Sequence, residues 1–262
     1  MAITGIEFRI LRDLRSEGAI PPNPSVLEFG EANWYGDVAV NQLVRGIKRY
    51  VTDLAEQRFL IDELERLVRI IDAGSFTDEL FDIAKIFYRI FLDCSEIAAI
   101  DLQGTKNAIR RDLNSPLKLG REFDIALNFG TGEHVFNTYQ FFKSVHDVTR
   151  AGGLMIHGMP FHGWIDHGFY CFQPTFYWDL ATANHYEPLQ VYICEITPTK
   201  LIQMSAREDV GKLVRENRIA KNAMIYAVLR MPEDKSEFQP PMQGYYAGTV
   251  SEEVRETWET ER

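Results

Sequence analysis

Cysteine is scarce in this chain: the three residues of this type are Cys94, Cys171 and Cys194. They are odd in number, widely spaced and embedded in apolar or aromatic sequence. That distribution suits reduced core thiols better than a disulfide framework or a zinc site. We therefore expect no chemistry from them.

Long apolar runs are also missing. No segment approaches the uninterrupted apolar length that a membrane span needs, so we expect no membrane partner. The opening sequence MAITGIEFRILRDLRSEG mixes charges through its apolar positions and lacks the apolar stretch of a secretory signal. The sequence thus predicts a cytoplasmic protein, and its 262 residues suffice for one domain that carries an insertion.

Positive charge is the third shortage. The chain has 28 Lys and Arg against 38 Asp and Glu, which gives a formal net charge of −10. Its longest basic clusters are the pairs Lys48-Arg49 and Arg110-Arg111. Nucleic-acid affinity depends on clustered basic side chains that displace counterions, so this composition disfavours nucleic acid and favours a small-molecule partner.

Short apolar segments are what the sequence has instead. Four of them, bounded by Gly, Pro or acidic residues, have the pattern of buried parallel strands and span 25–29, 96–100, 123–129 and 153–159. Two further strand-like runs, 189–196 and 223–229, flank a charged stretch that we expect to be helical. Strands that alternate with helices predict an α/β fold whose ligands bind beyond the carboxyl ends of a mostly parallel sheet.

Helical patterns fill the region between the first two strands. Apolar residues three or four apart predict two helices within 38–72, and the segment 78–92 is apolar on most sides, so more than one of its faces should be covered. We expect one domain over 1–235, with a helical insertion at about 40–92 and an acidic, extended C-terminal tail at 236–262. The insertion would cap the active site or form a homodimer interface.

Two strand ends carry residues suited to a ligand. Gly30 directly follows the first strand, where it permits a tight turn and close approach of a ligand to the backbone. Asp101 ends the second strand, and a carboxylate at this position in nucleoside-binding folds accepts hydrogen bonds from ribose hydroxyls. The alternatives are an ordinary strand-to-helix turn at Gly30 and a cap for free backbone N–H groups at Asp101.

Five sequence blocks follow one another along the chain: VLEFG, AAIDLQG, DLNSPL, FDIALNFGTGEHV and AGGLMIHGMP. In this order they resemble the class I S-adenosylmethionine-dependent methyltransferases over residues 25–229. The resemblance implies a Rossmann-like three-layer α/β sandwich, with a seven-stranded sheet and an antiparallel final strand. It also implies S-adenosylmethionine as cofactor and S-adenosylhomocysteine as product.

The resemblance further implies which residues bind the cofactor. Glu28 and Gly30 would form the methionine-binding turn, Asp101 would hold the ribose hydroxyls, and Asp112 would face the adenine amine. The residues after the fourth strand would line the cofactor. The full set is Glu28, Gly30, Asn33, Asp101, Leu102, Asp112, Leu113, Asn128, Phe129, Gly130 and Thr131.

The chain departs from the family pattern in two places. After Gly30, the residues Glu31, Ala32 and Asn33 stand where the family has closely spaced glycines. In addition, 73 positions separate Glu28 from Asp101, whereas a simple strand-helix-strand unit needs only about 30 residues. This spacing is the basis for expecting an insertion.

The segment 160–178 is expected to serve the acceptor substrate, because it combines histidines, an acid and many aromatic rings. Methyl transfer is an in-line displacement in which the protein aligns the reactants and, for a hydroxyl acceptor, removes a proton. His162 and His167 are candidate bases, Asp166 would orient one of them, and His134 is a third candidate. Histidines that merely cap turns are the alternative.

No metal is expected in this segment. The spacing of His162 and Asp166 would place them on one helix face, but Gly163 and Gly168 disfavour a helix there. No fourth ligand is apparent.

The sequence therefore predicts a small-molecule methyltransferase of biosynthetic metabolism, with O-methylation slightly favoured over N-methylation because the loop supplies histidines. A non-catalytic relative that keeps the fold as a binding or scaffold subunit is the alternative, although a scaffold would not need Asp101 and Asp112. An NAD-dependent dehydrogenase is less favoured, since Gly30 does not begin a G-x-G-x-x-G pattern.

Overall fold

The computed structural model describes residues 2–74, 77–94 and 96–260. It has an α/β fold with a seven-stranded mixed sheet and a separate two-stranded sheet, which confirms the predicted fold class. The chain divides into two compact units, Met1–Asp112 with Phe123–Phe129, and Leu113–Glu122 with Gly130–Arg262. Residues 75–76 of the expected insertion and 261–262 of the expected tail lie outside the described residues.

Three parallel strands form the sheet of the first unit. β2 (Ser25–Phe29) lies between β4 (Glu96–Ile100) and β5 (Phe123–Phe129) and pairs in parallel with both. These strands match the predicted segments. Strands covered on both faces have nearly continuous apolar sequences, which is the pattern that predicted them. The short strands β1 (Ala2–Ile3) and β3 (Asn33–Trp34) pair in parallel in the two-stranded sheet.

Beyond β4 the chain adds a single parallel bridge, between Ile100 and Ile109. The Ile109 amide donates to the Ala99 carbonyl at 2.8 Å. This bridge precedes Asp112, so the DLNSPL block begins where the bridged segment ends.

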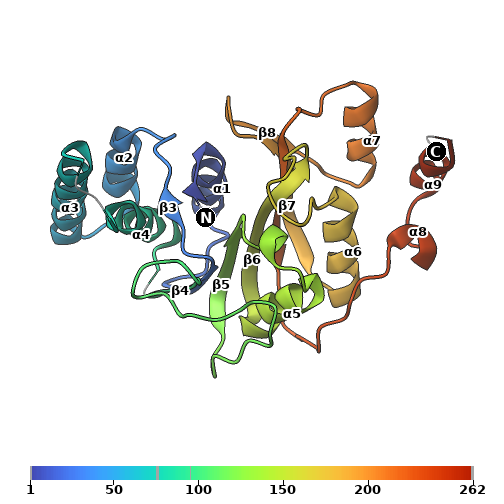
Figure 1. Cartoon of the computed structure of the whole chain (residues 1–262), viewed down its shortest axis with the longest axis horizontal. Coiled ribbons are helices and arrows are strands. Elements are labelled where there is room, and N and C mark those ends of the chain that lie inside the picture. Colours follow the sequence, from blue (N-terminus) through green and yellow to red (C-terminus); the bar gives the residue numbers. More distant parts are fainter. Residues whose placement is uncertain (1, 75–76, 95, 261–262) are drawn as a thin grey trace. The chain divides into compact units, whose positions relative to one another are not determined.

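Helices of the first unit surround α4. The predicted helices are confirmed as α2 (Val40–Tyr50), α3 (Leu54–Asp72) and α4 (Glu79–Leu92), all of which lie between β3 and β4 in the chain. α4 contacts α2, α3, β3 and the N-terminal helix α1 (Gly5–Ser16), and Figure 1 shows α2, α3 and α4 gathered together. The expectation that several faces of α4 are covered is therefore confirmed.

Two local features explain this helical group. α1 was not predicted, yet it begins with a capping box in which Thr4 and Glu7 satisfy each other's backbone N–H groups. α4 contributes Phe87 and Phe91 to a buried aromatic cluster, in which the rings of Phe91 and Phe8 lie 5.4 Å apart. Aromatic pairs at such distances add to the stabilisation from apolar burial.

The second unit contains the remaining strands in the order β6-β9-β7-β8. They are β6 (Thr149–His162), β9 (Ala223–Arg230), β7 (Glu187–Glu195) and β8 (Lys200–Gln203). β9 pairs antiparallel with both β6 and β7, which confirms the expected antiparallel final strand, and the hairpin partner β8 was not predicted.

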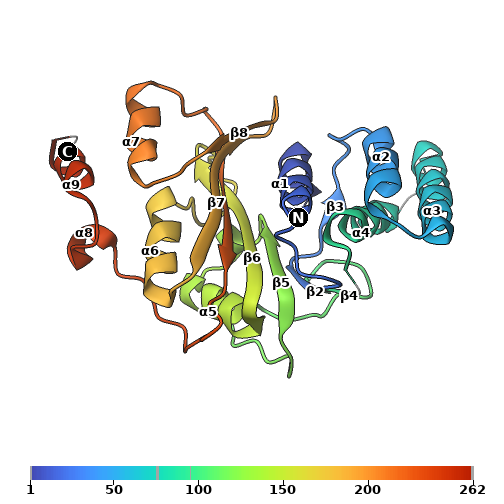
Figure 2. The same ribbon diagram turned by 180° about the vertical axis from the view of Figure 1, so that it is seen from behind.

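Helices accompany these strands. The short 3₁₀ helix η1 (Gly132–His134) is followed by α5 (Thr138–Val148), α6 (Pro174–Asn184) and α7 (Glu208–Arg215). α5 contacts β6, and α6 contacts β7 and β9, as Figure 2 shows. α7 is the helix predicted for the charged stretch, whereas α6 was missed, although Pro174 at its first turn is a typical start signal.

The C-terminal stretch is more structured than its composition predicts. It contains α8 (Gly244–Ala247) and α9 (Glu252–Thr260), and α9 contacts α7. Before α8, Phe238 is buried and the Gln239 amide donates to the Asn184 side chain at 2.8 Å. Among the described helices, none combines the length and apolarity needed to cross a membrane.

The cysteines are free thiols, but they are not all in the core. Cys194 is buried, Cys94 is half-buried and Cys171 is exposed. The expectation of core thiols is therefore correct for Cys194 and wrong for Cys171, which lies in the loop that follows β6.

Candidate functional site

The turn after β2 forms one candidate site, within the first unit. Gly30 has a φ of +87°, a conformation that only glycine adopts without strain, and its amide donates to the Ile100 carbonyl at 2.7 Å. Glu28 is buried beneath the turn, where its Oε1 accepts from the Tyr88 hydroxyl at 2.8 Å and from the Ala32 amide at 3.2 Å. Burial raises the pKa of Glu28 to about 8, because the charged form loses its hydration.

Asp101 lies at the carboxyl end of β4, as predicted, and it binds two pieces of backbone. Its Oδ1 accepts from the amides of Gln103 and Gly104 at 2.7 and 2.9 Å, and its Oδ2 accepts from the Glu31 amide at 2.9 Å. No described helix lies between β4 and β5, so Asp101 is not a helix cap, and its carboxylate instead holds the backbone of the turn and the loop. A carboxylate has about four acceptor positions, so three N–H donors leave room for another donor.

Glu31 interrupts the glycine pattern of the family, and its side chain holds this turn in place. It is 2% exposed, and its carboxylate accepts from the Thr105 amide at 2.6 Å and from the Thr105 hydroxyl at 3.0 Å. Lys85 of α4 pairs with it at 2.8 Å. A Cβ on Gly104 would lie 2.6 Å from Glu31 Oε2, so glycine is required for this close approach.

These contacts explain the irregular glycine loop. In place of flexible glycines, the chain uses a buried carboxylate to join the turn after β2 to the loop after β4. No sequence signal distinguishes Glu31 from a surface glutamate, because its partners Lys85 and Thr105 lie far along the chain.

The other predicted cofactor residues take different positions. Asn33 is half-buried in β3, and its side-chain oxygen has no hydrogen-bond partner among the described residues. Leu102 is 64% exposed, and Asp112 is exposed. The positions around the third and fourth blocks are buried or half-buried and comprise Leu113, Asn128, Phe129, Gly130 and Thr131.

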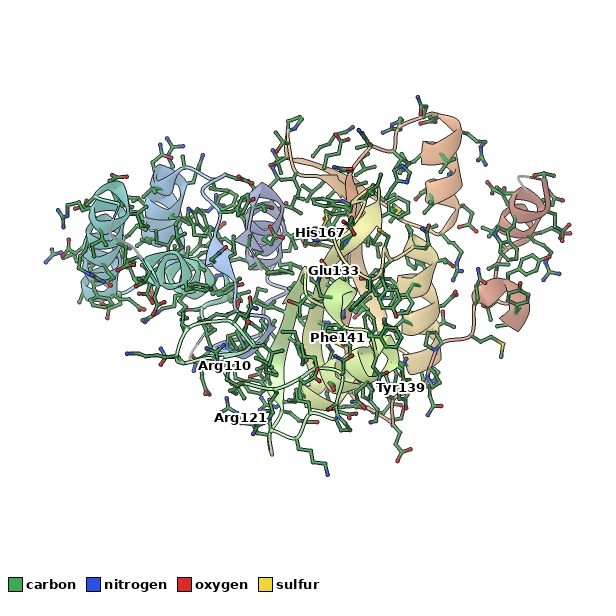
Figure 3. All side chains as sticks on the ribbon, viewed as in Figure 1. Arg110, Arg121, Glu133, Tyr139, Phe141 and His167 are labelled. Atoms are coloured by element: carbon green, nitrogen blue, oxygen red, sulfur yellow. The ribbon has the colours of Figure 1, made fainter. Side chains whose placement is uncertain are left out.

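A cluster of Glu133, His134 and His167 forms a second candidate site, within the second unit. Glu133 and His134 belong to η1, and His167 lies in the loop after β6. Glu133 Oε1 is 3.6 Å from His167 Nε2 and 3.8 Å from His134 Nε2. The two imidazole rings lie 5.2 Å apart, and Figure 3 shows Glu133 beside His167.

Backbone contacts hold the loop that carries His167 against η1. The Phe169 amide donates to the Glu133 carbonyl at 2.9 Å, and the His167 amide donates to the Trp164 carbonyl at 3.2 Å. The Trp164 indole in turn donates to the Ala223 carbonyl of β9 at 3.0 Å. Gly168 permits the approach, since a Cβ there would lie 3.1 Å from Glu133 Cγ.

The electrostatics of this cluster differ from those of Glu31. Glu133 is fully buried, and among the described residues neither of its carboxylate oxygens has a hydrogen-bond partner. Burial raises its pKa to about 7, and burial together with the neighbouring His167 lowers the pKa of His134. His134 is therefore largely neutral near pH 7, the state in which an imidazole accepts a proton or binds a metal.

The structure brings together His134 and His167 but not the other two candidates. His162 is exposed at the end of β6, where its ring lies beside that of Phe161. Asp166 is exposed in a left-handed turn with a φ of +61°. Glu133 was missed because nothing in the sequence shows that this glutamate is buried, or that a histidine 34 positions later lies beside it.

No protein-family model matches the chain, and no curated protein matches it. Among solved structures, the N-methyltransferase NodS from Bradyrhizobium japonicum WM9 is 11% identical with a TM-score of 0.46, and the match covers 86% of this chain and 94% of that one. A second NodS structure contains S-adenosyl-L-homocysteine.

Another match is the 1,6-didemethyltoxoflavin-N1-methyltransferase from Burkholderia thailandensis. It is 11% identical with a TM-score of 0.34, and the match covers 86% of this chain and 78% of that one. Similarity at this level says nothing about what this chain binds or converts.

The fold follows from the chain's own topology. The first unit has the strand order β4-β2-β5 with parallel pairing, and in the second unit β9 lies antiparallel between β6 and β7. Both are arrangements that the five ordered sequence blocks imply. The chain therefore has the fold of the class I methyltransferases.

Proposed function

We propose that this chain is an S-adenosylmethionine-dependent methyltransferase that acts on a small molecule. The observation that carries the proposal is the joint placement of Gly30 and Asp101 at the carboxyl ends of the neighbouring parallel strands β2 and β4. The hydrogen bond from the Glu31 amide to Asp101 links these two strand ends directly. This sheet edge is where α/β folds bind nucleotide-like ligands.

The residues of the turn fit the chemistry of this cofactor. Glu28 Oε2 and Asn33 Oδ1 are buried acceptors without hydrogen-bond partners among the described residues. Although burial raises the pKa of Glu28 to about 8, the positive ammonium group of S-adenosylmethionine would favour its charged form, whose oxygens accept hydrogen bonds. The remaining acceptor capacity of Asp101 suits a ribose hydroxyl. S-adenosylmethionine would supply the methyl group and leave as S-adenosylhomocysteine.

On the acceptor side, the proposal places proton removal at His134 or His167. The lowered pKa of His134 favours the neutral imidazole, and loss of a proton is required for a hydroxyl nucleophile, so O-methylation is favoured over N-methylation. The rings of Phe136 and Phe169 lie 6.0 Å apart and are 71% and 66% exposed. They offer an apolar platform next to the cluster, since the Phe169 amide binds the Glu133 carbonyl.

The proposal also includes a small-molecule acceptor, a cytoplasmic location and a homodimer. The net charge of −10 supports a small acceptor rather than nucleic acid, and a cytoplasmic location accords with free thiols. Exposed Leu54 and Phe59 on α3 support a homodimer through the helical insertion. Sedimentation of the purified chain over a range of concentrations tests the homodimer.

The test of the proposed function is a calorimetric titration with S-adenosylmethionine and, separately, with NAD. We expect saturable binding of one S-adenosylmethionine per chain and none of NAD. Absence of S-adenosylmethionine binding at millimolar concentration would overturn the proposal, and NAD binding would favour a dehydrogenase. A scaffold subunit would bind neither ligand.

A further inference from the structure

The cluster of Glu133, His134 and His167 has the composition of a metal site. Its ligand atoms, one from each residue, all lie within 4.8 Å of one another. Two imidazoles and one carboxylate are a ligand set that binds first-row transition metals, including catalytic Zn²⁺. We propose that these three residues bind a divalent transition-metal cation.

The distances are close to those of a loaded site. Ligands about 2.0–2.1 Å from a tetrahedral zinc ion lie roughly 3.3 Å apart. Glu133 Oε1 is 3.6 and 3.8 Å from the two Nε2 atoms, and all three ligand atoms lie within 4.8 Å of one another. A contraction of about 1.5 Å or less in these separations, through rotation of the imidazoles, would give the tetrahedral spacing. His134 and His167 have side chains that are 47% and 42% exposed, so their rings have room to rotate.

Glu133 provides the second, independent observation. It is fully buried, its oxygens have no hydrogen-bond donor, and among the described residues its only ion-pair partners are the two histidines. A buried carboxylate without a donor is costly unless a cation compensates it. Its Oε1 faces the two imidazoles at 3.6 and 3.8 Å, and imidazoles bind metals through their ring nitrogens.

The ligand set also indicates which cations bind. Imidazole nitrogen favours Zn²⁺, Co²⁺, Ni²⁺ or Fe²⁺, whereas Mg²⁺ and Ca²⁺ prefer a shell of oxygen atoms. Three protein ligands with solvent on the imidazole side leave at least one position for water or for an acceptor oxygen. A cation there would lower the pKa of a coordinated hydroxyl, and it would replace the imidazole base in the proton step.

This ligand set differs from the one rejected on the sequence, which combined His162, Asp166 and His167. Only His167 is shared, and the two other ligands come from η1. The proposal does not rest on the methyltransferase activity, since metal binding is measured without S-adenosylmethionine.

The test uses the full chain without a polyhistidine tag, titrated with Zn²⁺ by calorimetry after treatment with a chelator. We expect one Zn²⁺ per chain with a Kd in the micromolar range or below, and no response to Mg²⁺. Co²⁺ should give the visible absorption of a four- or five-coordinate site. Glu133→Gln, His134→Ala and His167→Ala should each weaken Zn²⁺ binding by more than about 100-fold, the upper limit for loss of an outer-shell partner.

His162→Ala is the matched control and should leave Zn²⁺ affinity unchanged, because His162 lies outside the cluster. Circular dichroism and thermal unfolding show whether each variant has folded. If an alanine variant fails to fold, Glu133→Gln still tests the site, because glutamine keeps the volume of the glutamate side chain. Weak Zn²⁺ binding that none of the three substitutions changes would overturn the proposal, as would absence of binding at micromolar Zn²⁺. A wild-type chain that binds S-adenosylmethionine but not Zn²⁺ would overturn the metal site and leave the proposed function standing.

Discussion

Glu31 and Glu133 are both buried carboxylates, and they differ in every other respect. Glu31 has an ion pair with Lys85 and two hydrogen bonds from Thr105, so its charge is compensated within the fold. The carboxylate of Glu133 has no hydrogen-bond partner among the described residues, and burial raises its pKa to about 7. A buried carboxylate with its donors in place stabilises a loop, whereas one that faces two imidazoles is available to a ligand.

The largest expected effect is on methyl-transfer turnover, and it tests the histidines beside Glu133. His134→Ala and His167→Ala should each lower methyl-transfer turnover by about 10²–10⁴-fold, because each removes the proton acceptor or a group that supports it. The measurement uses S-adenosylmethionine with a tritiated methyl group and a panel of phenols, sugars and amines, with the most active acceptor chosen for the variants. A His162→Ala variant with the same loss would show that the cluster is not the reactive group.

The next effect is on the free energy of unfolding, and it tests the stabilising role of Glu31. Glu31→Ala should lower the free energy of unfolding by about 3 to 4 kcal/mol, because it leaves the Thr105 donors buried without an acceptor and unpairs Lys85. Chemical denaturation measures the change. The control is Glu63→Ala, which removes an exposed ion pair with Arg66 and should cost about 0.5 kcal/mol or less. Equal losses in the two variants would contradict the role assigned to Glu31.

A third prediction follows from the raised pKa of Glu133. In the folded chain this carboxyl holds its proton up to about pH 7, against 4.5 for an ordinary glutamate. The stability it contributes is therefore complete below about pH 4.5 and is lost as the pH rises through 7. The full contribution of Glu133 to the free energy of unfolding, from a pKa shift between 4.5 and about 7, is about 3 kcal/mol.

The measurement is the difference in unfolding free energy between the wild type and Glu133→Gln from pH 4.5 to 8, with a chelator present. That difference should decline with rising pH, because the glutamine variant lacks the titrating group. A difference that is constant across this range would show that Glu133 titrates normally.

The smallest effect concerns glycine. Gly104→Ala should cost about 1–3 kcal/mol, because the new Cβ would lie 2.6 Å from Glu31 Oε2 and 2.9 Å from Asp101 Cβ. Gly211→Ala in α7 is the control, since its Cβ would meet the flexible end of the Arg215 side chain at 3.2 Å and Thr257 Cγ2 at an ordinary 3.9 Å, and alanine favours helix. Thermal unfolding compares the two. A larger loss at Gly211 would contradict the packing described here.

Much of the fold was predictable, because its strands are short, apolar and covered on both faces, and α4 is apolar nearly all round. The helix α1 was missed despite the Thr4 and Glu7 capping box. β8 was missed because a hairpin partner of four residues leaves little pattern in the sequence.

The candidate site was less predictable. Gly30 and Asp101 are recognisable because each directly follows a predicted parallel strand, and the carboxyl ends of parallel strands lie at the same edge of the sheet. Glu31 and Glu133 are not, because their burial depends on residues far along the chain. His162 and His167 are five positions apart and look equivalent in the sequence, yet only His167 is turned toward Glu133, through the tight turn at Trp164.

The most direct test of the account is S-adenosylmethionine binding by the wild type and by the His134→Ala and His167→Ala variants, measured by calorimetry under the same conditions. The account predicts that all three bind the cofactor with nearly equal affinity, since the cofactor residues and the histidine cluster have separate roles. No binding by the wild type at millimolar concentration, or loss of binding in the histidine variants alone, would contradict it.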